Sequence, residues 1–185
     1  MADKKRLFIG TFLKTDKLLK EYPKLKKNFE NAVFGKWVED WNLHFTYHFL
    51  GEIEADLVET LHFQLSPFLI EYESEISLLG LGCFPSLRSP KVLFVNLVDK
   101  NEILKGIHQN CGKVLSNFNI ELEKRDYHPH LTLLRIKSFE RNLFQKTLEK
   151  YSNFDFGKVE KFKVELIESK LTKEGPIYKV VQFLP

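Results

Sequence analysis

Two short segments of the chain each carry a histidine and a threonine separated by one residue. His44 and Thr46 lie in the run from 42 to 52, and His130 and Thr132 lie 86 positions further on. Residues two apart in a strand point to the same face of a sheet, so each segment would present an imidazole next to a hydroxyl. The intervening residues are apolar, which predicts that the opposite face of each strand packs into a core.

Two such strands brought together across one cleft would suit phosphodiester chemistry without a metal. One imidazole takes the proton from a water that attacks phosphorus, and the other, as imidazolium, protonates the departing oxygen. Each transfer contributes typically about 10²–10⁴-fold, and a histidine near pKa 6.5 suits both roles near neutrality. The threonine hydroxyls can hold the non-bridging oxygens, whose negative charge persists throughout the displacement.

Other histidines stand beside these pairs. By strict alternation His48 shares the face of His44, which predicts a place at the rim of the site. His128, held extended by Pro129, either orients His130 or caps the entrance of the strand. His128 and His130 could also begin a zinc site, but Asp126 is the only further ligand nearby. We therefore expect no metal and no cofactor.

The hydrophobic pattern places these motifs in an alternation of strands and helices. Apolar runs and period-two alternation predict strands at 6–13, 43–50, 75–84, 92–98, 130–136, 159–169 and 178–184. Helical spacing predicts helices at 16–33, 55–70, 102–118 and 139–151, with Pro23 either near the start of the first helix or kinking it. This order repeats about twice and favours two similar lobes. The alternative is a doubly wound parallel sheet. The sequence lacks the Gly-rich strand-to-helix loop that such a sheet usually presents to a nucleotide, which argues against this alternative.

Length and composition restrict the class of protein. A chain of 185 residues fits one domain, 1–185, with approximate lobes 1–88 and 89–185 and strand exchange between them left open. The formal charge of +3 is too small for a histone-like nucleic-acid binder. The two cysteines, Cys83 and Cys111, have no disulfide or zinc-finger spacing, which favours a reducing compartment.

Neither a signal peptide nor a membrane span is expected. The first apolar run, 7–13, ends at Lys14 without a cleavage site and is typical of a buried strand. No apolar run approaches the roughly 18 residues that a membrane span needs. We expect a soluble, cytoplasmic protein that is a monomer.

The two motifs resemble those of a known family. Paired H-x-T-x motifs, here His44-Phe45-Thr46-Tyr47 and His130-Leu131-Thr132-Leu133, resemble the 2H phosphoesterase superfamily. Within it, the chain is most similar to the bacterial and archaeal RNA 2′,3′-cyclic phosphodiesterases, long called 2′-5′ RNA ligases. The segments 6–9, 89–94, 127–135 and 166–183 extend the resemblance over nearly the whole chain.

The resemblance implies a bilobal α+β fold with antiparallel sheets on either side of a central cleft, and hydrolysis of RNA 2′,3′-cyclic phosphate ends to 2′-phosphate ends. His44 would be the proton donor to the leaving 3′ oxygen, and His130 the proton acceptor that acts on water. Thr46 and Thr132 would hold the phosphate. Arg135 would assist with phosphate or RNA, although its pleat parity is opposite to that of His130, so it reaches the cleft only if the strand twists or ends there.

Two other functions remain open at this stage. One is a nuclease or ligase acting on 2′-5′ linkages, and the other is a non-catalytic module that binds RNA ends. For His48 the family often has Lys or a small residue, which bears on substrate preference at the edge of the cleft. Tyr127, Trp37 and Trp41 border the motif strands and are candidates for stacking on bases.

Overall fold

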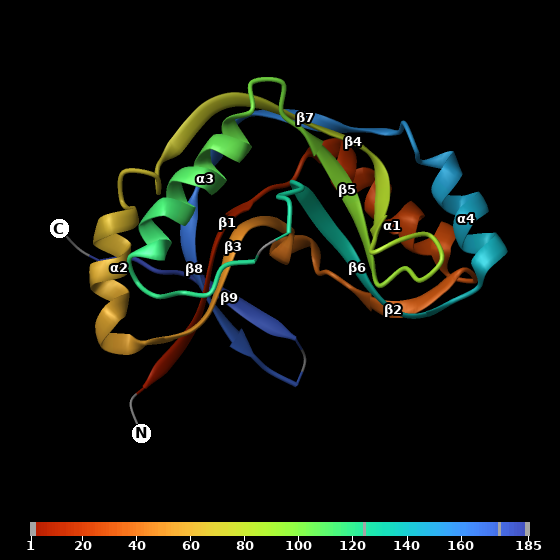
Figure 1. Cartoon of the computed structure of the whole chain (residues 1–185). Coiled ribbons are helices and arrows are strands. Elements are labelled where there is room, and N and C mark those ends of the chain that lie inside the picture. Colours follow the sequence, from red (N-terminus) through yellow and green to blue (C-terminus); the bar gives the residue numbers. More distant parts are fainter. Residues whose placement is uncertain (1–2, 124, 174, 184–185) are drawn as a thin grey trace.

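The computed structural model describes residues 3–123, 125–173 and 175–183 and shows an α+β fold built on two sheets (Figure 1). The first sheet has the order β3-β1-β8-β9, and the second has the order β2-β6-β5-β4-β7. The strands are β1 (Lys4–Phe12), β2 (Val33–Trp37), β3 (His44–Glu54), β4 (Glu71–Phe84), β5 (Val92–Val98), β6 (His130–Phe139), β7 (Asp155–Lys163), β8 (Glu165–Leu171) and β9 (Pro176–Val180). The helices are α1 (Asp16–Phe29), α2 (Val58–Leu65), α3 (Ile103–Ser116) and α4 (Arg141–Lys150), with single 3₁₀ turns at η1 (Asp40–Asn42) and η2 (Ala55–Leu57).

Every pairing between the described strands is antiparallel. The predicted α+β class, with two antiparallel sheets on either side of a cleft, is confirmed, and the parallel alternative is wrong. The expected strand 159–169 is two strands, because the chain passes from the second sheet to the first at the buried residue Val164. Strand β2 was missed by the sequence reasoning. The prediction for 178–184 extends past β9 to Leu184, which lies outside the described residues.

The helices bury one stripe each against these sheets. In α1 the buried residues are Leu18, Tyr22, Leu25 and Phe29, which follow the spacing of one helix face. The Thr15 hydroxyl caps this helix by accepting from the Leu18 amide at 3.0 Å, and Pro23 lies inside the helix. Within the part of the chain that the structure describes, no helix is long and apolar enough to cross a membrane.

Two helices pack against the sheet other than the one formed by the strand that precedes them, and each sheet contains strands from both halves of the chain. Although α1 follows β1 of the first sheet, it packs against β7 of the second; α3 follows β5 of the second sheet and packs against β3 of the first (Figure 1). Each sheet also combines strands from both halves of the sequence, since β8 and β9 complete the first and β2 and β4 join the second. The two sheets therefore depend on each other's chain segments.

The two motif strands have corresponding neighbours, although β3 is an edge strand and β6 also pairs with β2. β3 pairs with β1, and β6 pairs with β5. The offset of 86 residues that relates His44 to His130 also relates Phe8 on β1 to Phe94 on β5. The repeat suggested by the sequence thus includes the neighbouring strand of each sheet as well as the motif strand itself.

Candidate active site

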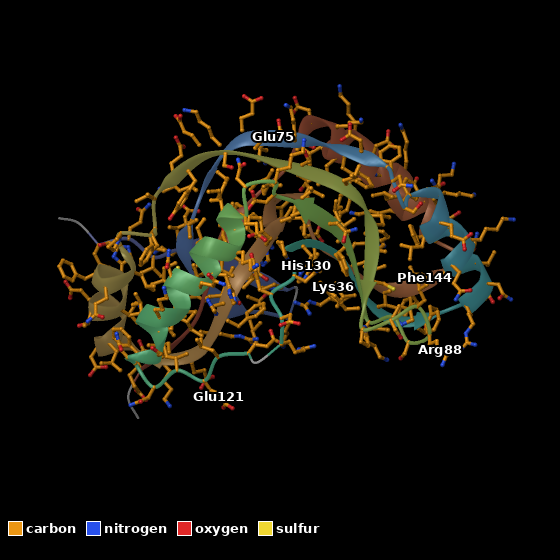
Figure 2. The ribbon with its side chains drawn as sticks, turned by 45° about the horizontal axis from the view of Figure 1, so that its top comes forward. Lys36, Glu75, Arg88, Glu121, His130 and Phe144 are labelled. Atoms are coloured by element: carbon orange, nitrogen blue, oxygen red, sulfur yellow. The ribbon has the colours of Figure 1, made fainter. Side chains whose placement is uncertain are left out.

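A cavity of about 780 Å³ brings the two motifs together. Its lining includes His44 and Thr46 from β3 and His130 and Thr132 from β6, so each sheet contributes one His-x-Thr pair. Figure 2 shows His130 near the middle of the molecule, whereas Glu75 and Arg88 lie toward its outside. The convergence expected from the double motif is present in the fold.

Both histidines are held in the same way. The Nδ1 of His44 lies 2.6 Å from the carbonyl oxygen of Asn42, and the Nδ1 of His130 lies 2.7 Å from that of His128. A carbonyl oxygen can only accept, so each Nδ1 donates its hydrogen to the residue two positions earlier. Each Nε2 is thereby left to take up or release a proton, as an acid–base pair requires.

Aromatic rings pack around each imidazole. The His44 ring lies 5.1 Å from the Phe8 ring and 4.7 Å from the Tyr178 ring, and the Phe12 ring is 6.1 Å away. The rings of Phe84 and Phe94 lie 5.0 and 5.1 Å from the His130 ring. These contacts fix the ring planes and make the surroundings of both histidines less polar.

Burial lowers the pKa of His44 below its usual value, and it lowers the pKa of His130 in the same way. The hydrogen bond from each Nδ1 to a carbonyl opposes this effect, and the positive charge of Arg135 adds to it at both rings. His130 also lowers the pKa of His44. Both imidazoles therefore favour the neutral form near pH 7, until a bound anion stabilises one of them as the cation.

Arg135 lines the cavity because a bulge interrupts β6. Phe94 pairs with Thr132 while Leu93 pairs with Leu134, so one residue on β6 is extra. The consecutive residues Leu133 and Leu134 are both buried, and the strand resumes with its alternation reversed. The parity problem recognised in the sequence is resolved in this way, and the guanidinium lies on the side of the catalytic pair.

The same irregularity occurs in β3 and affects His48. Ile9 pairs with His48 and Gly10 with Thr46, and the consecutive residues Tyr47 and His48 are both buried. The expectation that His48 shares one face with His44 is therefore wrong, since the alternation is broken between them. Phe49, 57% exposed, takes the place equivalent to that of Arg135.

His48 packs mainly toward α3. It is 7% exposed, its Nε2 lies 2.7 Å from the carbonyl oxygen of His108, and the two imidazoles are stacked with centroids 4.1 Å apart. Burial and the neighbouring imidazole lower the pKa of His108 to about 4. His48 also borders the cavity, and its contact with a substrate stays a prediction.

The Tyr127 ring packs against two other rings of the chain. The His108 ring stacks on it with centroids 4.2 Å apart, and the Tyr47 ring lies nearly parallel to it with centroids 6.2 Å apart. The Tyr127 hydroxyl is buried without a hydrogen-bond partner in the described part of the chain, and burial raises its pKa. This geometry favours a packing role over the expected stacking on a base.

The two tryptophans differ sharply in exposure. Trp37 is half-buried, with its ring 5.7 Å from that of Tyr22 and 6.4 Å from that of Phe29. Trp41 is 68% exposed and borders the cavity. Of the two, Trp41 is the one with ring surface available for stacking.

No group of three or more His, Cys, Asp or Glu side chains with metal-binding geometry occurs among residues 3–123, 125–173 and 175–183. His128 instead places its Nε2 3.3 Å from the side-chain oxygen of Asn96. His128 contributes to the site through its carbonyl, which orients His130.

Sequence reasoning missed the aromatic residues that complete the site. Phe8 and Phe94 could have been found, because the offset of 86 residues that links the histidines links them as well. Tyr178 reaches His44 from β9, the last strand of the first sheet, and no local pattern connects it to the motif. Phe49 faces the cavity only because of the bulge in β3, and period-two alternation does not predict that bulge.

A bilobal α+β fold with one His-x-Thr strand in each sheet and a cavity between them defines a two-histidine phosphoesterase. Residues 8–185 match the family model described as the AKAP7 2'5' RNA ligase-like domain. The chain belongs to this family.

Relatives with similar sequences agree with this membership, and solved structures share the fold. A protein of Aquifex aeolicus named RNA 2',3'-cyclic phosphodiesterase is 35% identical over 186 residues, covering 96% of this chain and 95% of its own. One of Methanocaldococcus jannaschii with the same name is 34% identical, covering 96% of this chain and 98% of its own. Among solved structures, TT0787 of Thermus thermophilus (TM-score 0.75, 21% identity, 96% and 95% coverage) and E. coli LigT complexed with 3'-AMP (TM-score 0.72, 19% identity, 97% coverage of each chain) share the fold.

Proposed function

We propose that this protein hydrolyses the 2′,3′-cyclic phosphate at an RNA end to a 2′-phosphate, without a metal or cofactor. The observation that carries the proposal is the pair of imidazoles in one cavity, each with Nδ1 bound to a carbonyl and Nε2 available for proton transfer. The names of the relatives, which cover nearly the whole chain at 34–35% identity, support the same substrate class.

The proposed reaction is one displacement at phosphorus with two proton transfers. The Nε2 of His130 takes a proton from the water as its oxygen bonds to phosphorus. The Nε2 of His44, in the imidazolium form, gives its proton to the 3′ oxygen as the bond between phosphorus and that oxygen breaks. The assignment of donor to His44 and acceptor to His130 follows the family motifs that these positions match.

The remaining polar groups would hold the anion in place. Thr46 and Thr132 follow the histidines on the same strand faces, and their hydroxyls can donate to the non-bridging oxygens. Arg135 would supply a permanent positive charge and a fork of donors suited to phosphate. No step of this mechanism needs a metal.

An aromatic wall beside His44 gives the terminal nucleoside a place. The Phe8 ring contacts the His44 ring and lies 6.1 Å from the ring of Phe49, which faces the cavity. Phe8 is buried, so it supports Phe49 from behind, and a base whose phosphate lies between the histidines can pack against the exposed Phe49 ring, since aromatic side chains stack on unpaired bases.

The test is an end-group analysis of an oligonucleotide that carries a 2′,3′-cyclic phosphate. The expected product has a 2′-phosphate, and His44→Ala and His130→Ala are each expected to lower turnover by about 10²–10⁴-fold while RNA still binds. Phe63 is an exposed residue on α2 that does not line the cavity, so Phe63→Ala is a matched control that is expected to leave turnover unchanged. A 3′-phosphate product contradicts the proposal. Binding without turnover would support the non-catalytic module, and joined 2′-5′ products would support the ligase.

A further inference from the structure

Trp41 is a large aromatic side chain that the described part of the chain leaves uncovered at the edge of the cavity. It is 68% exposed and borders the same cavity as His44. Trp37, by contrast, packs on Tyr22 and Phe29, and within the described residues no aromatic ring packs on Trp41. An exposed indole in a cavity presents a flat apolar surface to whatever enters.

The segment that carries Trp41 is fixed to the catalytic centre. The next residue, Asn42, closes the η1 turn through its amide, which donates to the Glu39 carbonyl at 2.9 Å. Its side-chain nitrogen donates to the carbonyl of Pro176 on β9 at 3.1 Å, and its own carbonyl accepts from the Nδ1 of His44. One residue thus connects the Trp41 segment to the last strand of the first sheet and to the proton donor.

Trp41 and Phe49 both line the cavity and lie on either side of His44 along the chain. Trp41 precedes His44 by three residues and lies in the η1 turn, whereas Phe49 follows it by five residues and lies in β3. A terminal nucleoside that packs against Phe49 with its phosphate between the histidines therefore leaves the indole unoccupied. Ile177, 60% exposed on β9 beside Pro176, extends the apolar surface at this end of the cavity.

We propose that Trp41 is the stacking surface for the base of the second nucleotide, the one on the 5′ side of the nucleotide that carries the cyclic phosphate. The inference rests on the proposed function, because a 3′-terminal cyclic phosphate has a neighbour only on its 5′ side. Stacking on an aromatic ring tolerates any base, so this subsite selects single-stranded RNA of at least two nucleotides over mononucleotides, with little preference for sequence.

The experiment compares two substrates that differ in one base. The first is the adenine dinucleotide with a terminal 2′,3′-cyclic phosphate, and the second is the same molecule without the base on its 5′ residue. Backbone, charge and reacting bond are identical. The wild-type protein is expected to show a kcat/KM roughly 5- to 150-fold higher for the first substrate, mostly through KM, because stacking holds substrate and transition state alike.

Three variants test whether Trp41 causes the difference. Trp41→Ala is expected to remove the advantage of the complete dinucleotide, because kcat/KM falls far more for that substrate than for the abasic one. Trp41→Phe should keep most of the advantage, since a smaller aromatic ring remains. Phe63→Ala, an exposed aromatic outside the cavity lining, should change neither value.

Fluorescence provides a readout independent of turnover. The chain has two tryptophans, so Trp37→Phe leaves Trp41 as the only indole. Its emission is expected to be quenched by the dinucleotide product and to change little with the abasic product. An equal loss of Trp41→Ala activity on both substrates, or no loss on either, overturns the subsite. If the wild-type protein hydrolyses neither substrate, the proposed function itself fails instead.

Discussion

The separate roles of the two histidines can be tested by changing the leaving group. In the proposed mechanism His44 protonates the departing oxygen and His130 deprotonates water. A ribose alkoxide needs that proton, whereas the nitrophenolate of bis(4-nitrophenyl) phosphate leaves without it. His44→Gln should therefore be severely impaired on a 2′,3′-cyclic nucleotide and only slightly impaired on the nitrophenyl ester. His130→Gln should be impaired on both, because both reactions need an activated water.

The expected loss can be estimated from the surroundings of His44. Positioned proton transfer contributes about 10²–10⁴-fold, which corresponds to about 3–5 kcal/mol of barrier. The nearest other hydroxyl-bearing ring is that of Tyr178, and burial raises its pKa, so it is a poor substitute acid. We expect a loss in the upper half of that range on the cyclic nucleotide and less than about 10-fold on the nitrophenyl ester.

The assay is steady-state kinetics on both substrates, with melting curves to show that the variants fold. Glutamine fills much of the space between the rings of Phe8 and Tyr178 and can still donate to the Asn42 carbonyl. If both variants lose activity equally on both substrates, the separation into acid and base is refuted. If the selectivity appears in His130→Gln, the roles are exchanged.

Four further outcomes are expected. Burial and Arg135 lower the pKa of both histidines, and turnover needs one imidazole protonated and the other neutral. In a pH–rate profile kcat/KM should therefore peak below pH 6.5. A maximum above pH 7 contradicts this expectation. Arg135→Gln removes a positive charge that lowers the pKa of His44 and of His130, so the maximum of kcat/KM for this variant should move to higher pH while kcat falls. A maximum at the same pH would place the guanidinium away from the two histidines. Activity should persist in excess EDTA, because the two imidazoles supply both proton transfers; strong inhibition would revive the zinc alternative. Thr15→Ala removes the cap of α1 and should lower the unfolding free energy in urea by about 1–2 kcal/mol, with unchanged kcat in the folded protein.

The sequence alone predicts a large part of this site. Repetition makes His44, Thr46, His130 and Thr132 identifiable, since two copies of a short motif on equivalent strands are far more informative than one. The antiparallel arrangement came from the resemblance and the lack of a Gly-rich loop, and it is confirmed. The cytoplasmic location and the monomeric state stay predictions.

The features that were missed share a physical origin. A bulge adds one residue to a strand and reverses the pleat, so Arg135 and Phe49 face the cavity although simple alternation turns them away. The chain passes from the second sheet to the first at Val164, although periodicity assigns the whole run to a single strand. Tyr178 meets His44 through tertiary pairing of distant segments. None of these leaves a local pattern.

The pairing of β1 with both β3 and β8 has a consequence for synthesis of the chain. β3 follows β1 closely, whereas β8 begins only at Glu165, so a ribosome exposes the first partner of β1 long before the second. Until then the edge of β1 that later pairs with β8, along residues 7–10, is an open template for other strands. The nascent protein must keep that edge from aggregating until β8 has been synthesised, and His44 meets Tyr178 only after β9 has followed.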